Sequence, residues 1–334
     1  MSFTVNFIER RDRETGSIET VFSQIGQELE RRGVKVMFEK LPYGNDAAGM
    51  IKNLAFFKPK PADIFHITGH AHHISLRLPP ERTVLTVHDL GILNTRRGLR
   101  RWILKKLLFD LPVRRLNHIT AISENTKREL VEQTQCAENE IRVIGDPLPA
   151  SLPQQPKKFS PECPTILQVG TAPNKNLENL ARALKDLNCR LRVIGSINSG
   201  QEELLRNNGI RYENRIGLSS ADIGEEYANA DIVVFCSTFE GFGLPIIEAQ
   251  AAGVAVLTSD IDPMRDVAGK NAVLADPLDP ESIRNQIRRL ISDRDLRDAA
   301  VAGGLENIRR FAPEKIAGEY LEIYELILKN LRTK

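Results

Sequence analysis

Two glutamates, Glu240 and Glu248, are the side chains of this sequence whose types and spacing best suit chemistry. Gly241 and Gly243 between them allow a tight turn with unhindered backbone N–H groups. Pro245 suits the first position of a helix, where its missing N–H would have no partner. A helix N-terminus offers partial positive charge and free N–H groups, which favour phosphate. Since carboxylates accept hydrogen bonds from sugar hydroxyls, the segment predicts a site for a sugar attached to a phosphate.

A strand and a helix must hold these two glutamates in place. The apolar run 232–236 predicts a buried parallel strand, and a helix is expected from Pro245 to near Gly253. Glu240 would then lie just before the helix and Glu248 about one turn inside it. Both carboxylates would face the crevice at the carboxyl end of the strand, where open α/β sheets bind ligands.

The segment 240–248 resembles the retaining glycosyltransferases of family 4, the group 1 transferases. Their signature is a glutamate, seven residues and a second glutamate, usually around Glu-Gly-Phe-Gly-Leu-Pro, and the flanking segments 230–235 and 252–256 also fit. The resemblance implies an α/β chain with two Rossmann-like doubly wound domains facing a cleft, the GT-B fold. It implies that Glu248 accepts the ribose hydroxyls of a nucleotide-diphosphate sugar. Glu240 would hold the hexose or its phosphate together with the backbone amides of Gly241, Phe242, Gly243 and Leu244.

A second loop, Gly170 to Lys175, follows a predicted strand and has the position of a βα phosphate loop. Lys175 is expected to begin a helix, where its ammonium could meet a diphosphate; a solvated surface lysine is the alternative. In the resembled family a lysine here holds the donor diphosphate, and an arginine commonly accompanies it. Thr171 and Asn174 stand where that arginine would be. The resemblance therefore implies donor contacts from Gly170, Thr171 and Lys175.

Two segments of the N-terminal half could complete the site. Gly16 permits a close backbone approach and Ser17 could cap the first helix, which is also the plainer interpretation of this loop. His88 ends a predicted strand, where it could hydrogen-bond to a substrate or be satisfied locally. By the resemblance, Gly16 and Ser17 lie near the donor phosphates, and His88 acts beside the donor sugar with Glu240 and Lys175.

Short apolar strands alternating with helices predict two parallel sheets. The expected strands are 3–8, 34–39, 63–67, 83–87, 118–122 and 142–144, followed by 165–169, 191–194, 231–235, 255–258 and 272–274. Six prolines between positions 147 and 164 indicate a linker. We therefore expect two domains, at 1–150 and 151–312, and the resemblance implies that the first binds the acceptor and the second the nucleotide-sugar donor. The resemblance implies that a C-terminal helix, within 313–334, returns to the first domain.

Composition narrows the class of partner. With 41% apolar residues each half could bury a core, and a formal net charge of only +2 argues against nucleic acid. Four scattered cysteines and an N-terminus without a signal peptide favour a cytoplasmic protein.

Three histidines lie close together in the first half of the sequence. His70, His72 and His73 could suggest a metal, but a polar cleft loop is favoured because no carboxylate or cysteine stands close by in the sequence. We expect neither a metal nor a cofactor.

A basic and apolar cluster surrounds Trp102, the only tryptophan, in segment 96–109. Such a pattern can indicate an anionic membrane surface, here the inner face, or an ordinary half-buried helix. The apolar and basic positions do not separate cleanly around a helical wheel. A peripheral membrane contact would suit a lipid-linked acceptor.

These observations lead to one expected activity and two alternatives. We expect a metal-independent, retaining hexosyltransferase that acts in polysaccharide biosynthesis, on an oligosaccharide, lipid-linked or other hydroxyl acceptor. The segment His88-Asp-Leu90 resembles mannosyltransferases, which favours GDP-mannose. The alternatives are a sugar-nucleotide epimerase on the same fold and a non-catalytic nucleotide-sugar-binding subunit.

Overall fold

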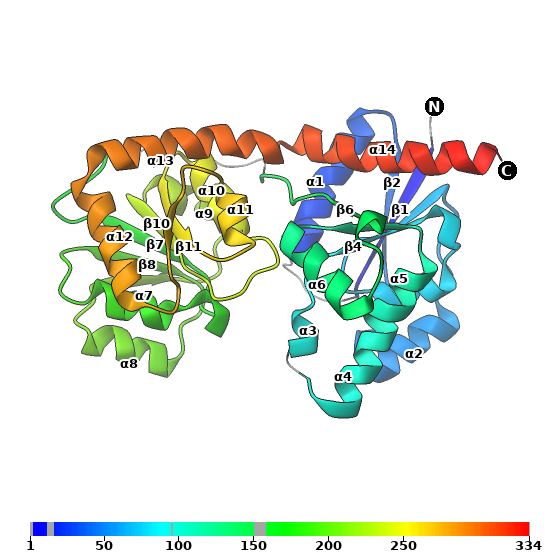
Figure 1. Ribbon diagram of the computed structural model, residues 1–334, viewed down its shortest axis with the longest axis horizontal. Helices are drawn as coiled ribbons and strands as arrows, with labels where there is room; N and C mark the ends of the chain where they lie inside the picture. Colours follow the sequence, from blue (N-terminus) through cyan, green and yellow to red (C-terminus); the bar gives the residue numbers. More distant parts are fainter. Residues whose placement is uncertain (1–2, 12–16, 95, 150–157, 334) are drawn as a thin grey trace. The chain divides into compact units, whose positions relative to one another are not determined.

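Two compact domains make up the chain. The computed structural model describes residues 3–11, 17–94, 96–149 and 158–333. The first domain combines residues 1–147 with 312–334, and the second spans 148–311 (Figure 1). The boundaries expected from the sequence, after residues 150 and 312, differ from these by three residues and by one residue. Within the proline-rich segment, residues 150–157 lie outside the described part.

The first domain is built on a six-stranded parallel sheet with the order β2-β1-β3-β4-β5-β6. The central strands are almost wholly buried, which explains their continuous apolar runs. Their bounds are β1 Thr4–Glu9, β2 Lys35–Lys40, β3 Ile64–Ile67, β4 Thr83–Val87, β5 His118–Ala121 and β6 Ile141–Val143.

The second domain repeats this architecture with the strand order β12-β11-β10-β7-β8-β9, again all parallel. Its strands are β7 Thr165–Val169, β8 Arg190–Ile194, β9 Tyr212–Arg215, β10 Ile232–Phe235, β11 Ala255–Ser259 and β12 Val273–Ala275. All eleven strands expected from the sequence are confirmed, with ends that shift by one residue at most. The strand β9 was missed because its residues, Tyr-Glu-Asn-Arg, are polar at a partly exposed edge.

Helices cover both faces of the first sheet. The helix α1 (Ser17–Arg31) packs against the C-terminal helix α14 (Pro313–Arg332) on one face. The apolar cluster on the other face takes residues from α2, α5, α6 and the π-helical turn 106–110. The remaining helices of this domain are α2 Ala47–Phe56, α3 Gly91–Asn94, α4 Gly98–Lys105, α5 Leu111–Arg115 and α6 Glu124–Thr134.

A buried chain of polar groups fastens α14 to the first sheet. His66 on β3 lies 2.6 Å from the Tyr324 hydroxyl and 2.7 Å from Thr86 Oγ1. Thr86 also contacts Thr120 Oγ1 at 2.7 Å and the Tyr320 hydroxyl at 3.2 Å. Burial lowers the pKa of His66 to about 3, so the imidazole is neutral and links two hydroxyls. These contacts explain why the last helix belongs to the first domain.

In the second domain α7 packs against α12 on one face of the sheet, and α10 packs against α13 on the other. The bounds are α7 Leu177–Leu184, α8 Ser199–Asn207, α9 Ser220–Ala228, α10 Leu244–Ala251, α11 Met264–Ala268, α12 Pro280–Ser292 and α13 Arg294–Asn307. Among all the helices described in the two domains, none combines the length and apolarity needed to cross a bilayer.

Candidate active site

The second sheet reverses its winding direction between β7 and β10. From β7 the chain proceeds outward through β8 and β9, whereas β10, β11 and β12 extend to the other side. Open α/β sheets bind ligands at such a switch point, beyond the carboxyl ends of the strands. The loop after β7 carries Lys175, and the loop after β10 carries Glu240. The Thr238 N–H donates to the Asn174 carbonyl at 2.8 Å, which joins the two loops.

Lys175 and Glu240 form an ion pair at this point. Lys175 Nζ donates to Glu240 Oε1 at 2.6 Å, and both side chains are largely buried. Asn174 Nδ2 donates to the same carboxylate oxygen at 3.3 Å and to the Phe239 carbonyl at 2.9 Å. The Lys175 ammonium also lies 4.6 Å from the ring centroid of Phe235. The structure thus unites two of the three residues predicted to be catalytic, and Lys175 is not a solvated surface lysine.

The expectation that Lys175 begins a helix is wrong. It ends a short 3₁₀ turn, Pro173–Lys175, and α7 begins two residues later. Asn176 separates the two elements because it adopts the left-handed region at φ 60°, which interrupts regular helical geometry. The Asn176 side chain donates to the carbonyls of Cys236 (2.9 Å) and Pro277 (2.7 Å), which fixes this break.

Gly170 lets the lysine side chain lie close to the backbone. Its φ of +87° favours glycine, and an added Cβ would stand 2.9 Å from Lys175 Cγ. Gln168, nearly fully buried, donates to the Lys175 carbonyl at 2.9 Å and closes the loop from below. Thr171 donates its hydroxyl to the Ser196 carbonyl at 2.6 Å. The Thr171 side chain is therefore already held by the protein.

The helix α10 begins at the predicted place, one residue before Pro245. Gly243 precedes it with a φ of +109°, which an L side chain rarely adopts. The Phe242 side chain is buried and packs edge-on against Phe311, with ring centroids 5.4 Å apart. Only the backbone of Phe242 could therefore face a ligand. The helix ends at Ala251, slightly earlier than expected.

Glu248 lies inside α10 and is held by a tyrosine from another helix. The Tyr227 hydroxyl, at the end of α9, donates to Glu248 Oε2 at 2.6 Å. Burial raises the pKa of Glu248, while the Tyr227 hydrogen bond and the positive charge of Lys175 oppose this rise. Tyr227 is itself fully buried, so its phenol ring has little freedom to move. One carboxylate oxygen of Glu248 is thus fixed by the protein.

In the first domain, His88 is buried at the end of β4. Its Nε2 lies 2.8 Å from the Thr68 carbonyl, so Nε2 carries the proton and donates. Burial, together with nearby His70, lowers the pKa of His88 to about 4. The neutral ring keeps Nδ1 as a hydrogen-bond acceptor. Gly16 lies outside the described residues, as does the side chain of Ser17, whose backbone begins α1.

The histidine-rich segment is packed rather than arranged around an ion. His72 is buried with Nδ1 2.8 Å from the Leu108 carbonyl, and burial lowers its pKa to about 3. His73 is buried beside it, whereas His70 lies 3.7 Å from Asp89 Oδ2. No group of three or more histidine, cysteine or acidic side chains that could hold a metal occurs in the described parts of the chain.

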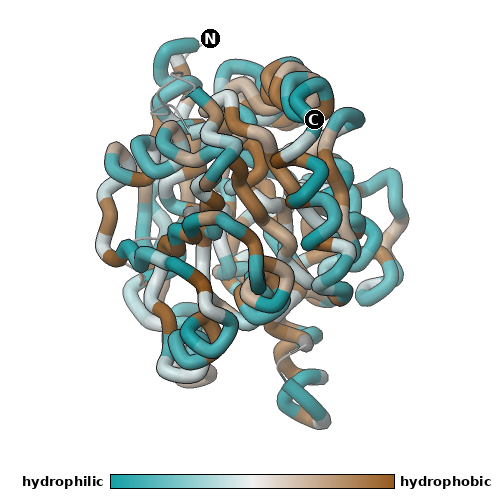
Figure 2. The backbone as a smooth tube through the Cα atoms, turned by 90° about the vertical axis from the view of Figure 1, so that its left-hand side faces the viewer, coloured by the Kyte–Doolittle hydropathy of each residue, from teal (hydrophilic) through white to brown (hydrophobic). Residues whose placement is uncertain are grey.

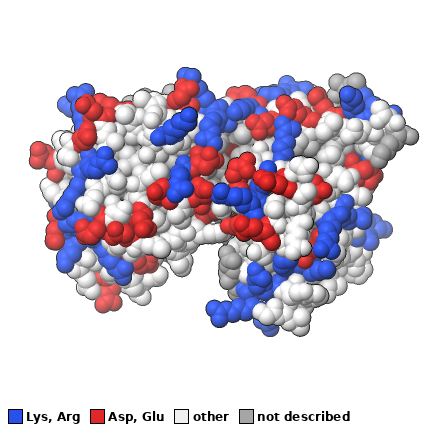
Figure 3. Space-filling view, viewed as in Figure 1, with Lys and Arg blue, Asp and Glu red and all other residues white. Residues whose placement is uncertain are grey.

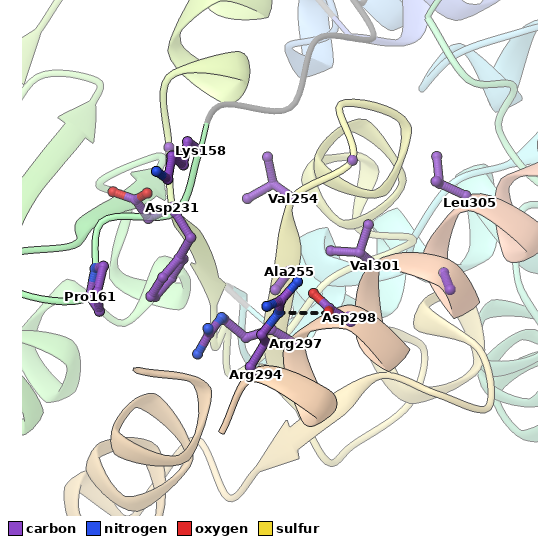
Figure 4. Close-up of a pocket in the computed structure, with 14 residues that line it drawn as sticks. Lys158, Pro161, Asp231, Val254, Ala255, Arg294, Arg297, Asp298, Val301 and Leu305 are labelled. Carbon is purple, nitrogen blue, oxygen red and sulfur yellow. Dashed lines mark hydrogen bonds and ion pairs between the residues drawn. The ribbon is translucent and has the colours of Figure 1, made fainter. Parts of the chain in front are cut away.

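A pocket of about 670 Å³ in the second domain is not the candidate site (Figure 4). It is lined by Asp231 and Val254, which precede β10 and β11, and by Arg294 and Arg297 of α13. Because parallel strands start at the same edge, this pocket lies at the opposite end of the sheet from Glu240. The Arg297 guanidinium already contacts another side chain in this pocket, because it lies 3.9 Å from the ring centroid of Phe159.

The chain thus has two doubly wound α/β domains. The second of them carries a cation, two carboxylates and a helix N-terminus at its switch point. Solved structures share the fold over nearly the whole chain. Sucrose-phosphate synthase from Thermosynechococcus elongatus covers 98% of this chain and 99% of its own, with a TM-score of 0.79 and 16% identity. The Anabaena protein HepE, in complex with UDP and glucose, covers 97% and 99%, with a TM-score of 0.76 and 16% identity.

Comparison of sequences gives the family. Residues 153–306 match "Glycosyl transferases group 1", and residues 30–149 match "Glycosyltransferase Family 4". The O-antigen chain mannosyltransferase B of Escherichia coli is 28% identical over 277 residues, which are 74% of this chain and 71% of the relative. The chain belongs to the group 1 glycosyltransferases and has the GT-B fold, as the resemblance implied.

Residues that sequence reasoning missed act behind the predicted ones. Tyr227 stands 21 positions before Glu248 and ends a helix without any motif of its own. Gln168, Asn176 and Gln201 are buried amides that tie the lysine loop to its surroundings. The sequence held one local indication of their role, because Gln168 and Asn176 flank the loop from Gly170 to Lys175. Their partners are set by tertiary packing, which local spacing does not reveal.

Proposed function

We propose that this glycosyltransferase transfers a hexose, with mannose favoured, from a nucleotide-diphosphate sugar to a hydroxyl acceptor with retention of anomeric configuration. The observation that carries the proposal is the pairing of Lys175 with Glu240 at the switch point of the second domain. The Lys175 ammonium would attract a diphosphate, and the neighbouring Glu240 carboxylate would orient sugar hydroxyls.

Lys175 is proposed to stabilise the departing diphosphate. Its ammonium already lies in a low-dielectric setting over the Phe235 ring, where charge interactions are stronger than in water. The family arginine is replaced by Thr171 and Asn174, and the hydroxyl and amide of these residues are held by protein oxygens. Lys175 and the backbone amides of 241–244 at the start of α10 would therefore supply most of the positive potential. A metal ion is not required in this proposal.

Glu248 is proposed to bind the ribose. Its Oε2 accepts from Tyr227, which leaves Oε1 as an acceptor for sugar hydroxyls. Glu240 would hold the hexose, with Gly170 and Thr171 beside the phosphates. In the first domain, His88 would accept one hydrogen bond through Nδ1, and a role for Gly16 and Ser17 near the phosphates rests on the family resemblance alone.

GDP-mannose is the favoured donor, because a similar protein is an O-antigen chain mannosyltransferase. That name also supports a carbohydrate acceptor and a place in polysaccharide biosynthesis, on the cytoplasmic side where nucleotide sugars are available. Oligosaccharides and lipid-linked saccharides are both acceptors of the proposed class.

A thermal-shift screen tests the donor. GDP-, UDP- and ADP-sugars and the free nucleotides are added without metal, with and without a chelator, to the wild type and Glu248→Ala. A ligand that binds only the folded state raises its stability by about 2.7 kcal/mol at a hundred times its Kd. We expect one nucleotide class to stabilise the wild type and to lose its effect in the variant.

Other outcomes decide against the proposal. Absence of any shift at millimolar nucleotide would reject a donor site. Binding followed by conversion of the donor sugar without an acceptor would identify an epimerase. Binding without turnover under any acceptor would identify a non-catalytic subunit.

A further inference from the structure

The surface of α4 in the first domain is exposed where it is most apolar. Leu99, Trp102 and Ile103 expose 71%, 61% and 40% of their surface. They stand at spacings of three and four residues, so they share one face of the helix. Lys106 follows at the next position on this face, in the π-helical turn. We call Leu99, Trp102, Ile103 and the basic residues around them the α4 surface.

Three of the four large apolar residues in α4 face outward, and basic residues flank them. Leu104 packs against the apolar core of the first domain, so α4 is half-buried on its inward side. Arg101 is drawn inward, where it donates to the Leu93 carbonyl and to Gln133, and Lys105 pairs with Asp110 at 2.8 Å. The inward side of α4 is therefore held by these polar contacts and by Leu104, while Leu99, Trp102 and Ile103 are left outward.

The charge of this surface has one sign. Between Asp89 and Asp110 the sequence holds six basic residues and no acidic one. Arg96, Arg97 and Arg100 are exposed, and none of them forms an ion pair with an acidic residue of the described chain. Lys and Arg side chains gather over α4 beside uncharged ones (Figure 3).

The shape is convex. The segment around α4 extends away from the first sheet and carries both hydrophobic and hydrophilic residues along it (Figures 1 and 2). Exposed aromatic and aliphatic side chains rimmed by like charges mark an interaction site. A bilayer can receive a projecting apolar ridge without a complementary groove, whereas nucleic acid offers phosphates but no apolar interior for Leu99 and Ile103.

We propose that the α4 surface docks the first domain onto an anionic lipid bilayer. Trp102, Leu99 and Ile103 enter the headgroup and upper acyl region, while Arg96, Arg97, Arg100 and Lys106 contact lipid phosphates. This inference is independent of the donor chemistry of the second domain. It places the acceptor-binding domain at a membrane, where acceptors with a lipid anchor are concentrated.

The single tryptophan makes the test direct. Full-length protein is titrated with vesicles of phosphatidylcholine alone or of equimolar phosphatidylcholine and phosphatidylglycerol. We expect the Trp102 emission to shift to the blue, and to be quenched by brominated acyl chains, with the anionic vesicles only. Raising salt from about 0.1 to about 1 M shortens the Debye length from about 10 to about 3 Å and should weaken binding.

Two pairs of variants keep Trp102 as the reporter. Arg96→Glu/Arg100→Glu should weaken partitioning by at least about 25-fold, at about five-fold per arginine. Leu99→Ser/Ile103→Ser should remove the blue shift while leaving electrostatic attraction. Arg294→Glu and Ile216→Ser, at exposed positions of the second domain, are the matched controls and should change nothing. Each variant must retain the wild-type melting temperature.

Three results would overturn the inference. The first is an emission spectrum that stays unchanged with anionic vesicles. The second is equal binding to neutral vesicles at both salt concentrations. The third is a blue shift that appears on concentrating the protein without lipid, which would assign the α4 surface to a second copy of the chain.

Discussion

Lys175 and Glu240 stand 65 residues apart in the sequence, yet their charged atoms lie 2.6 Å apart. They meet because β7 and β10 are neighbours in the sheet, although α7, β8, α8, β9 and α9 separate these two strands along the chain. The pair keeps the ammonium in place before a ligand arrives. A diphosphate that binds here must share the ammonium with Glu240, so the positions of leaving group and sugar are linked through one cation.

Replacing Lys175 with alanine should remove most of the activity. Loss of one preorganised group that stabilises developing negative charge costs about 10²–10³ in kcat. The measurement is steady-state nucleotide release in the presence of acceptor. Lys185→Ala, an exposed lysine in the same domain, is the control and should behave as wild type. Equal activity of Lys175→Ala and wild type would show that another group meets the diphosphate.

Tyr227→Phe should weaken nucleotide binding without abolishing it. The change removes the hydroxyl that fixes Glu248, and a hydrogen bond to a charged group contributes about 1.5–3 kcal/mol. We expect Kd for the free nucleotide to rise by about ten-fold or more while kcat changes little, because Tyr227 acts through Glu248. Tyr212→Phe, which removes a hydroxyl bonded to Glu202 at the surface, should leave Kd unchanged.

Gly170→Ala tests whether the lysine side chain needs the glycine. The new methyl group would meet Lys175 Cγ at 2.9 Å in addition to the strain of a positive φ. Gly209→Ala separates the two effects, because Gly209 also has a positive φ, +67°, but no atom within 4 Å of the added Cβ. Both variants should melt earlier than wild type, and only Gly170→Ala should also lose nucleotide affinity. A Gly170→Ala variant with normal affinity would contradict this account.

Acidification should destabilise the first domain selectively. The pKa values of His66 and His72 are lowered to about 3, and those of His73 and His88 to about 4, mainly by burial. Below the ordinary pKa of 6.5 the unfolded chain therefore binds protons that the folded domain does not, and stability falls with pH. Burial raises the pKa of Asp146 to about 7 and also raises the pKa values of Glu9, Glu129 and Glu319, which offsets part of this loss.

Hydrogen exchange at pH 7 and pH 5 can follow each domain separately. All six histidines belong to the first domain, so the second serves as an internal control. We expect exchange protection in β3 and β4 to drop at pH 5 by an amount on the order of 1–2 kcal/mol per histidine, relative to the second domain. An equal loss in both domains would show that the buried histidines do not govern the effect.

The sequence predicted the sheets well because parallel strands are buried on both faces and form apolar runs, as in Ile232–Phe235. It predicted the turn and the helix start between Glu240 and Glu248 because both are determined by local residues such as Gly243 and Pro245. It failed where distant packing decides. The helix expected at Lys175 is interrupted by Asn176, whose side chain is held by carbonyls of later segments. The face of α4 could not be read from the wheel alone, because Arg101 and Lys105 turn inward to partners elsewhere.

The most direct test of the central claim is the stereochemistry of one turnover. The donor found by nucleotide screening is incubated with the protein and a hydroxyl acceptor, with and without a metal chelator, and the new glycosidic linkage is assigned from its one-bond anomeric C–H coupling by NMR. From GDP-α-mannose we predict an α-linked product, formed equally well with the chelator and at least about 100-fold more slowly in Lys175→Ala. A β-linked product, or transfer at the wild-type rate in Lys175→Ala, would contradict the account.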